Sequence, residues 1–107
     1  MPEFITVSGP QGGIATLTLN RPDRKNALST ALRDEVSDAL DALAADADTK
    51  VLVVTGAGDA FCAGFDLKEF QRAGTDAGFG KALWASSARY HRAVLSFPLA
   101  AVAAKFL

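Results

Sequence analysis

Residues 55 to 70 of this 107-residue chain read TGAGDAFCAGFDLKEF, and most of the groups that could do chemistry lie there. Glycines that follow a buried strand and precede a helix let backbone N–H groups approach an anion, and the helix N-terminus adds a positive potential. The dinucleotide fingerprint fails because Phe61 stands where its third glycine belongs, and a P-loop fails because Phe65 follows Gly64 where lysine is required. The residues alone therefore leave two interpretations open, an anion site and a plain turn around a buried Phe61.

Few other side chains of the sequence are chemically reactive. Cys62 is the single cysteine, so it cannot form an internal disulfide, and we expect a small buried side chain rather than a nucleophile. His91 is the single histidine and lies beside Arg89 and Arg92 in an expected helix, which favours a packed or surface position over a catalytic one. The sequence offers no set of His, Cys, Asp and Glu residues at metal-ligand spacing, so no metal site is expected.

The expected elements that position these residues begin in the order β-β-α-β. Apolar and polar residues alternate on both sides of a glycine-rich turn, which predicts a β-hairpin over residues 4–19 with one buried face. Apolar residues recur at helical spacing from Leu28 to Leu43 and predict an amphipathic helix of about four turns, with Ser29 as its N-cap. The run KVLVVTG at residues 50–56 has no polar alternation and is typical of a strand covered on both faces.

The second half of the sequence predicts two helices and a further strand. A short helix is expected over residues 66–74, a loop over residues 76–81, and a long helix over residues 81–97 that ends before Pro98. We expect Gly74 to close the short helix, and Trp84 and Tyr90 to pack the long helix on its neighbours. Residues 99–107, LAAVAAKFL, predict the opening of another buried strand. No repeat, low-complexity run or linker interrupts the chain, so we expect a single domain or a piece of one.

The composition argues against several classes of partner. Lys and Arg total 11 against 12 Asp and Glu, and their signs alternate along the chain instead of forming a basic block. Nothing therefore favours nucleic acid or an anionic membrane, and an anionic ligand must be held by a few placed residues. The N-terminal residues MPEFITVSGP contain no basic segment followed by an apolar stretch, so we expect neither secretion nor membrane insertion, and a cytoplasmic location.

Two families share letters with the glycine-rich stretch. The segment TGAGDAF (Thr55–Phe61) resembles the anion-hole motif of ribokinase-like sugar kinases, which implies that Asp59 would act as a base toward a sugar hydroxyl. In those kinases an acidic residue usually precedes the motif where this chain has Val53 and Val54, and a long sugar-binding half comes first. A single heptapeptide supports this resemblance.

A second resemblance covers the whole chain. The segments LNRPDRKNALS (Leu19–Ser29), VLVVTGAGDAFCAGFDLKEF (Val51–Phe70) and FPLAAVAA (Phe97–Ala104) follow the order and approximate spacing of the N-terminal part of the crotonase superfamily, the enoyl-CoA hydratase/isomerase family. Separated motifs in a matching order rarely arise by chance. The resemblance implies an α/β fold, the N-terminal part of a crotonase-like β-β-α spiral. The wording DAFCAGF is also similar to the 4-chlorobenzoyl-CoA dehalogenase branch, so the acyl group and the reaction type stay open.

The chemistry that this resemblance implies is stabilisation of a thioester enolate. Family members act on acyl-CoA thioesters through an enolate-like intermediate, whose negative charge develops on the thioester oxygen. By resemblance, the backbone N–H of Phe65 is one of two donors to that oxygen. Ala63 and Gly64 would permit the tight turn, and the helix that follows would add its dipole.

The resemblance also implies where coenzyme A would bind, as part of the substrate and without a permanently bound cofactor. Lys25 and Lys68 are the candidates for phosphate contacts, with Arg24 as a less certain neighbour. The residues expected to approach the adenine and pantetheine through backbone atoms are Ala27, Ala63, Asp66 and Leu67. The alternative for each cation is a solvated surface position, and the alternative for Asp66 is a carboxylate that stabilises the helix dipole.

The resemblance ends where this chain reads Lys105-Phe106-Leu107. The family would continue there with a hydrophobic residue, Asn-Gly and a glycine-rich helix start that gives the second donor, and then with acid and base carboxylates. We therefore expect residues 1–107 to be a truncated N-terminal portion of a single crotonase-like domain, inactive alone, whether cut short or completed by another polypeptide. The alternative function is a non-catalytic CoA-binding or degenerate fragment. The family implies a homotrimer or hexamer.

Overall fold

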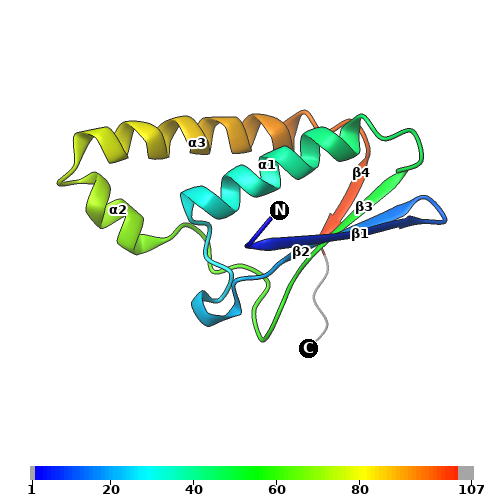
Figure 1. Cartoon of the computed structure of the whole chain (residues 1–107), viewed down its shortest axis with the longest axis horizontal. Helices are drawn as coiled ribbons and strands as arrows, with labels where there is room; N and C mark the ends of the chain where they lie inside the picture. Colours follow the sequence, from blue (N-terminus) through cyan, green and yellow to red (C-terminus); the bar gives the residue numbers. More distant parts are fainter. Residues whose placement is uncertain (1, 104–107) are drawn as a thin grey trace.

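The first two strands form the hairpin that the alternating pattern predicts. The computed structural model of the chain describes residues 2–103 (Figure 1). Strand β1 (Ile5–Gln11) pairs antiparallel with β2 (Ile14–Leu19). Gly12 and Gly13 connect them at φ values of 57° and 83°. A two-residue hairpin turn requires this left-handed conformation, which glycine adopts without strain.

One face of the hairpin is buried, as predicted. Its buried residues are Ile5, Ala15, Leu17 and Leu19. Val7 is 43% exposed because it borders an open pocket between β1 and the helical layer. Ile14 is 49% exposed because it falls outside the period-two alternation of the buried residues of β2 and so lies on the other face.

The hairpin continues into a sheet of four strands in the order β1-β2-β3-β4. Strand β3 (Val51–Gly56) runs parallel to β2, and β4 (Ala100–Ala103) runs parallel to β3. Leu52 is fully buried, whereas Val51 and Val53 are only partly covered. The expectation that β3 is covered on both faces is therefore not met among the described residues, because the described helices cover one face of the sheet (Figure 1).

Strand β4 forms at the expected place but is not buried. Its four residues are all exposed, because β4 is the outermost strand of the described sheet and has a strand partner on one side only. The prediction of a buried strand is thus wrong for residues 100–103. The rest of the predicted strand, residues 104–107, lies outside the described residues.

Helix α1 (Thr30–Ala44) lies across the sheet and supplies most of the helical side of the core (Figure 1). As predicted, Ser29 is its N-cap, and its Oγ accepts a hydrogen bond from the Leu32 N–H at 3.2 Å. The residues of α1 that pack against the sheet recur every three or four positions: Leu32, Val36, Leu40 and Leu43. This spacing confirms the amphipathic pattern.

Two further helices complete the layer: α2 (Leu67–Ala73) and α3 (Ala77–Leu95). Helix α3 begins earlier than predicted, so the expected loop over residues 76–81 is wrong. Asp76 is the N-cap of α3, and its Oδ1 accepts a hydrogen bond from the Phe79 N–H at 3.0 Å. A cap of this kind offsets the low helix propensity of the glycines in the first turns.

Glycines also set the contact between α2 and α3. Gly74 closes α2 as its C-cap, as predicted. Gly80 is buried in α3, where an added Cβ would lie 3.2 Å from the carbonyl oxygen of Ala73. The absence of a side chain at Gly80 therefore lets the two helices approach closely.

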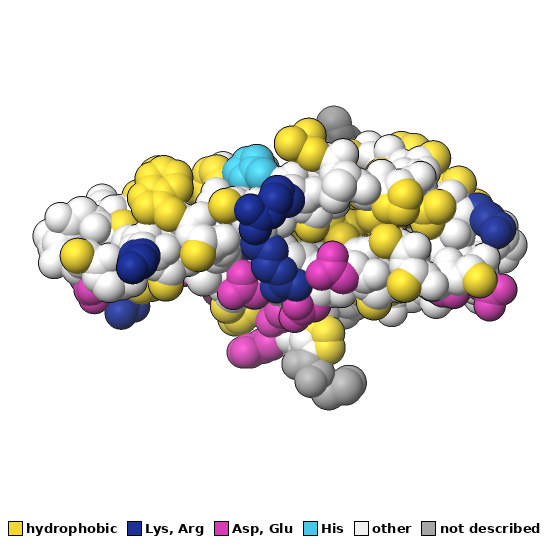
Figure 2. Space-filling model, turned by 90° about the horizontal axis from the view of Figure 1, so that it is seen from above, with side chains coloured by type: hydrophobic (Ala, Val, Ile, Leu, Met, Phe, Trp, Pro, Cys, Tyr) yellow, Lys and Arg dark blue, Asp and Glu magenta, His cyan; other side chains and the backbone are white. Residues whose placement is uncertain are grey.

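The outer face of α3 mixes apolar and charged side chains. Figure 2 shows this face, on which a band of charged groups separates apolar ones. Trp84 is 64% exposed, but its ring centroid lies 6.4 Å from that of Phe70, so it contacts the neighbouring α2 at the surface of the layer. Tyr90 is half-buried and packs on the core. Arg89 forms ion pairs with Asp38 and Asp41 of α1 at 2.7 and 3.1 Å.

None of the helices between residues 2 and 103 combines the length and apolar character that crossing a bilayer requires.

Candidate functional site

The loops that follow β2 and β3 carry the motif residues, and the side chain of Asn26 joins them. Asn26 is fully buried, and its Oδ1 accepts a hydrogen bond from the Arg21 N–H at 2.8 Å. Its Nδ2 donates to the carbonyl oxygens of Ala57 and Ala60 at 2.9 and 2.8 Å. The φ of Asn26 is 57°, a left-handed conformation that asparagine tolerates better than most residues. One side chain thus ties its own loop to two residues that lie 31 and 34 positions further along the chain.

A short parallel bridge between Leu28 and Phe65 makes a second tie between the loops. The Leu28 N–H donates to the carbonyl oxygen of Gly64 at 2.7 Å, and the Asp66 N–H donates to the carbonyl oxygen of Leu28 at 3.3 Å. In a bridge of this pattern the residue between the two bonded neighbours turns its own N–H and C=O to the opposite side. Accordingly, none of the described residues accepts a hydrogen bond from the Phe65 N–H.

Gly64 provides the backbone conformation that brings Phe65 to this bridge. Its φ is 95°, in the region that favours glycine, although a Cβ there would meet open space. Its N–H donates to the Sγ of Cys62 at 3.4 Å. The conformation fits the tight turn expected here.

Arg21 and Asp66 form a partly buried ion pair beside the bridge. Their side chains are 18% and 13% exposed, and the Arg21 Nη1 lies 3.0 Å from the Asp66 Oδ2. The same Nη1 donates to the carbonyl oxygen of Ala27 at 3.0 Å. Burial opposes ionisation of Asp66, but the hydrogen bonds from Arg21 and the Lys68 N–H outweigh it and hold the pKa of Asp66 below its ordinary value of 3.8. Asp66 is also the N-cap of α2, the structural role given above as its alternative.

These contacts frame an open pocket of about 250 Å³ beside the backbone of Phe65. Arg24 lines it together with six of the residues expected from the sequence: Ala27, Ala63, Phe65, Asp66, Leu67 and Lys68. Arg24 and Lys68 bring two cations to the pocket, while the carboxylate of Asp66 is already paired with Arg21. Neither cation forms an ion pair with another described residue, so an anionic ligand group can meet both of them close to a backbone amide.

The two other expected site residues, Lys25 and Gly64, are not among the lining residues. Lys25 has a φ of 52° and an exposed side chain, and its carbonyl oxygen accepts a hydrogen bond from the Ala63 N–H at 3.0 Å. The backbone of Lys25 therefore supports the wall of the pocket. Arg24, the less certain candidate by sequence, lines the pocket directly.

Cys62 and His91 lie outside this pocket. Cys62 is partly buried and lines an apolar cavity of about 210 Å³ between the sheet and the helices. His91 is exposed, in agreement with the predicted packed or surface position, and its ring centroid lies 6.1 Å from that of Phe65. Its Nδ1 lies 2.8 Å from the carbonyl oxygen of Ser87, so Nδ1 is assigned as the protonated nitrogen because a carbonyl only accepts. Within residues 2–103, His, Cys, Asp and Glu side chains form no group that could hold a metal ion.

Arg33 reaches the bridge from inside the fold. It is 1% exposed, and its Nη1 donates to the carbonyl oxygen of Leu28 at 2.7 Å. Its Nη2 donates to the Oγ1 of Thr30 at 3.2 Å, and its Cζ lies 5.0 Å from the ring centroid of Phe65. The Thr30 N–H and Oγ1 in turn donate to the Oε1 of Glu69 at 2.8 and 2.9 Å. Burial lowers the pKa of the Arg33 guanidinium, Glu69 opposes this change, and the group stays charged at neutral pH.

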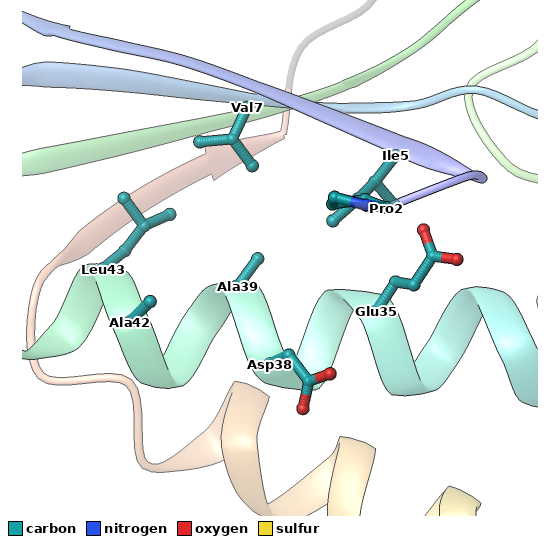
Figure 3. A pocket seen from close by; sticks show the side chains of 8 residues that line it. All are labelled: Pro2, Ile5, Val7, Glu35, Asp38, Ala39, Ala42 and Leu43. Atoms are coloured by element: carbon teal, nitrogen blue, oxygen red, sulfur yellow. The ribbon is translucent and has the colours of Figure 1, made fainter.

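A second pocket, of about 490 Å³, lies between β1 and α1 (Figure 3). Glu35 points toward the start of β1, and its Oε1 accepts hydrogen bonds from the N–H groups of Glu3 and Phe4, which precede the strand, at 2.9 and 2.8 Å. Asp38 points away from β1 and pairs with Arg89 of α3. Both carboxylates of this pocket are thus engaged in holding the fold together, and the remaining lining is mostly apolar, so the pocket beside Phe65 is the better candidate site.

Sequence reasoning did not identify three residues that build the site: Arg21, Asn26 and Arg33. The first two lie within LNRPDRKNALS, so the motif contained them, but no periodicity distinguishes a buried asparagine from a loop asparagine. Arg33 stands beside the apolar stripe of α1, next to Leu32, and one turn after Ser29. A cation at the margin of a buried apolar stripe is a weak indication of a buried charged residue, and it is the one feature of the sequence that could have identified Arg33.

Known proteins are similar to this chain in sequence. The family model described as enoyl-CoA hydratase/isomerase matches residues 9–105. Hydroxycinnamoyl-CoA hydratase-lyase of Pseudomonas fluorescens is 50% identical over 62 residues, which are 58% of this chain and 22% of that protein. The 1,2-epoxyphenylacetyl-CoA isomerase of Escherichia coli strain K12 is 41% identical over 69 residues, which are 64% of this chain and 26% of that protein.

Solved structures are similar to the fold as a whole. An enoyl-CoA hydratase/carnithine racemase from Magnetospirillum magneticum superposes with a TM-score of 0.84 at 33% identity, over 94% of this chain and 38% of that one. An enoyl-CoA hydratase from Mycobacterium smegmatis gives a TM-score of 0.82 at 35% identity, over 94% of this chain and 39% of that one. The chain therefore spans less than half the length of the proteins it matches.

Proposed function

Because the chain belongs to the enoyl-CoA hydratase/isomerase family, we propose that its pocket beside Phe65 binds an acyl-CoA thioester and that the Phe65 N–H is one donor of an oxyanion hole. The predicted crotonase-like α/β fold is confirmed by the solved relatives. In the proposed reaction a negative charge develops on the thioester oxygen in an enolate-like intermediate. A fixed backbone donor stabilises that charge more than it stabilises the neutral carbonyl, which lowers the barrier.

One observation carries this proposal: the bridge between Leu28 and Phe65 uses the carbonyl of Gly64 and the N–H of Asp66. It therefore orients the Phe65 N–H away from Leu28, and none of the described residues accepts a hydrogen bond from it. An amide that is fixed on both sides and has no acceptor within residues 2–103 is suited to bind a ligand oxygen without reorganisation.

The charges of the pocket support binding of coenzyme A. Arg24 and Lys68 are exposed cations among the lining residues, and each can approach a phosphate. Asp66 would otherwise repel phosphate, but its charge is paired with Arg21. Ala27 and Ala63 have small side chains, which let pantetheine or adenine approach the backbone. Lys25 stays a candidate at longer range through its exposed side chain.

The acyl group is proposed to be planar and aromatic. The ring of Phe65 packs edge-on against Phe70 at 5.5 Å and faces His91 at 6.1 Å, so the pocket adjoins an aromatic cluster. Aromatic groups stack favourably on such clusters. The names of the two relatives described above contain hydroxycinnamoyl and phenylacetyl groups, which are aromatic.

We expect residues 1–107 alone to bind the thioester without turning it over. General acid or base catalysis requires a carboxylate free to exchange a proton with the substrate. Near Phe65, Asp66 is held by Arg21, and Glu69 is held by Thr30. The second candidate function, non-catalytic binding of CoA, rests on this same engagement of both carboxylates.

Family assembly as trimers or hexamers and a cytoplasmic location stay predictions. Light scattering of the purified chain would measure its oligomeric state.

The family match includes Thr55–Phe61, which leaves the sugar-kinase interpretation without support. That segment forms the end of β3 and a turn, in which Asp59 is exposed, and Asp59 is not a lining residue of the pocket. ATP-dependent phosphorylation of sugars by the chain is expected to be nil.

Binding of cinnamoyl-CoA to the purified chain tests the proposed function. A hydrogen bond to the thioester oxygen polarises the conjugated carbonyl, so we expect the absorption of bound cinnamoyl-CoA to shift to longer wavelength. The Phe65→Pro variant lacks the donor N–H and should lose the shift, whereas the Phe65→Ala control keeps the amide and should retain it. A wild-type spectrum without a shift, or a shift that survives in Phe65→Pro, would refute the oxyanion role.

A further inference from the structure

We propose that Arg33 is a positioning residue that fixes the Phe65 N–H for its ligand, acting from the interior of the fold and without touching the ligand. The inference rests on the proposed function, because it assigns Arg33 a role only if the Phe65 amide is an oxyanion donor. Arg33 belongs to α1 and is not a lining residue of the pocket. Its effect must therefore pass through the groups that it contacts.

The principal contact is with the bridge that orients Phe65. The Arg33 Nη1 donates to the carbonyl oxygen of Leu28 at 2.7 Å, and that same oxygen accepts the Asp66 N–H at 3.3 Å. Leu28 also donates to Gly64, so the residues on both sides of Phe65 are bonded to Leu28. A charge-assisted hydrogen bond to a single carbonyl thus holds the residue that sets the direction of the Phe65 amide.

A second contact acts on Phe65 itself. The guanidinium Cζ lies 5.0 Å from the ring centroid of Phe65, within range of a cation–π interaction. The ring is also held by Phe70 on α2 at 5.5 Å. Arg33 therefore restrains the backbone on both sides of Phe65 through Leu28, and it contacts the side chain of Phe65 directly. Together these contacts limit rotation of the Phe65 amide.

The burial of Arg33 indicates that stability alone does not explain its presence. The side chain is 1% exposed, and among the described residues its Nε has no hydrogen-bond partner. Placing a cation in the interior with one donor unpaired is costly, and an apolar residue at a buried position is often at least as stable. The proposed role of its polar contacts at the site accounts for a buried cation that stability alone does not explain.

Further hydrogen bonds link Arg33 to the first turn of α1 and to α2. Its Nη2 donates to Thr30 Oγ1, and Thr30 donates twice to Glu69 of α2. The first turn of α1, the bridge and α2 are thus joined through one guanidinium and one carboxylate.

The test compares Arg33→Met with Arg89→Met, a control that removes a partly exposed cation from the helical layer. Hydrogen exchange of single amides measures the bridge, and the infrared carbonyl band of bound cinnamoyl-CoA, labelled with ¹³C at the thioester carbon, measures the hydrogen bond to the ligand. In Arg33→Met we expect the Leu28 and Asp66 amides to exchange roughly 10-fold faster or more, while the Leu40 amide is unchanged. The shift of the carbonyl band to lower frequency should fall by at least half, with less than about a threefold change in affinity, because CoA contacts are untouched.

The outcomes separate this inference from the proposed function. A wild-type chain that gives no carbonyl shift refutes the oxyanion role and this inference with it. A wild-type shift that persists in Arg33→Met, or unchanged exchange of the Leu28 and Asp66 amides, overturns the role of Arg33 alone. If Arg33→Met does not fold, Arg33→Lys decides, since an ammonium cannot bond Leu28 and Thr30 in the fork geometry of a guanidinium. It should reduce the carbonyl shift while circular dichroism stays that of the wild type, and an unchanged shift in that variant contradicts the inference.

Discussion

Replacement of Asn26 by alanine is expected to lower the free energy of unfolding by about 4 kcal/mol. The side chain makes three hydrogen bonds at 2.8 to 2.9 Å, and each contributes about 1 kcal/mol when its partner is only partly covered. Alanine at a φ of 57° adds about 1 kcal/mol or more, because its Cβ crowds the backbone in the left-handed region. Small domains are stable by about 5 to 15 kcal/mol, so the variant should lose a large fraction of its stability.

Urea unfolding followed by circular dichroism measures this loss. Asn26→Gly removes the same hydrogen bonds without the backbone strain, so it should lose about 3 kcal/mol, and its difference from Asn26→Ala reports the strain separately. Asn20→Ala is the matched control, since Asn20 is an exposed asparagine at the start of the same loop and should change stability by less than about 0.5 kcal/mol. A loss below about 1 kcal/mol in Asn26→Ala would show that the two loops are held together by other contacts.

Three further variants test the packing and the electrostatics of the fold. Gly56→Ala should lose about 1 to 3 kcal/mol, because the new Cβ would lie 2.3 Å from the carbonyl oxygen of Phe61, and an unchanged melting temperature would contradict that clash. Leu32 is fully buried, so Leu32→Ala should lower the free energy of unfolding by about 2 to 5 kcal/mol. Leu67 is 73% exposed, so the control Leu67→Ala should lower it by less than about 0.5 kcal/mol. Equal losses for the two variants in chemical denaturation would contradict the assigned core. Because the pKa of Asp66 is lowered on folding, its contribution to stability is complete above its ordinary value of 3.8 and is lost as the pH falls below it. Asp66→Asn should flatten that part of the profile of melting temperature against pH, and an identical profile in the variant would refute the assignment.

The sequence predicted the elements whose signals are local. The alternation in the hairpin, the stripe from Leu28 to Leu43 and the Ser29 cap all depend on residues within a few positions of one another, and the structure confirms them. The start of α3 was not predicted, because glycines have low helix propensity and the segment DAGFGK therefore favours a loop. In the structure Asp76 caps the helix and allows it to begin at Ala77. The burial of β4 was overestimated because apolar composition reports what a strand could bury, whereas exposure depends on which elements lie beside it.

The candidate site was predictable in its location and less so in its construction. Six of the eight expected residues gather at one pocket because they belong to two motifs that the fold brings together. The ties that bring them together could not be derived from spacing, since Asn26 reaches partners 31 and 34 positions away and Arg33 bonds a carbonyl that belongs to the loop before its own helix. Interactions of this kind depend on the path of the backbone, which local patterns do not determine.

The backbone character of the pocket has a consequence for how such a protein could change over evolutionary time. The proposed donor is a main-chain amide, and the walls at Ala27 and Ala63 offer little beyond their main chain. Side chains around the ligand can then be exchanged, and the preferred acyl group retuned, while the anion-binding capacity is inherited intact. The vulnerable positions are instead remote from the ligand. Asn26 touches no ligand under this proposal, yet its loss would remove one of the ties between the two loops and weaken the pocket as a whole.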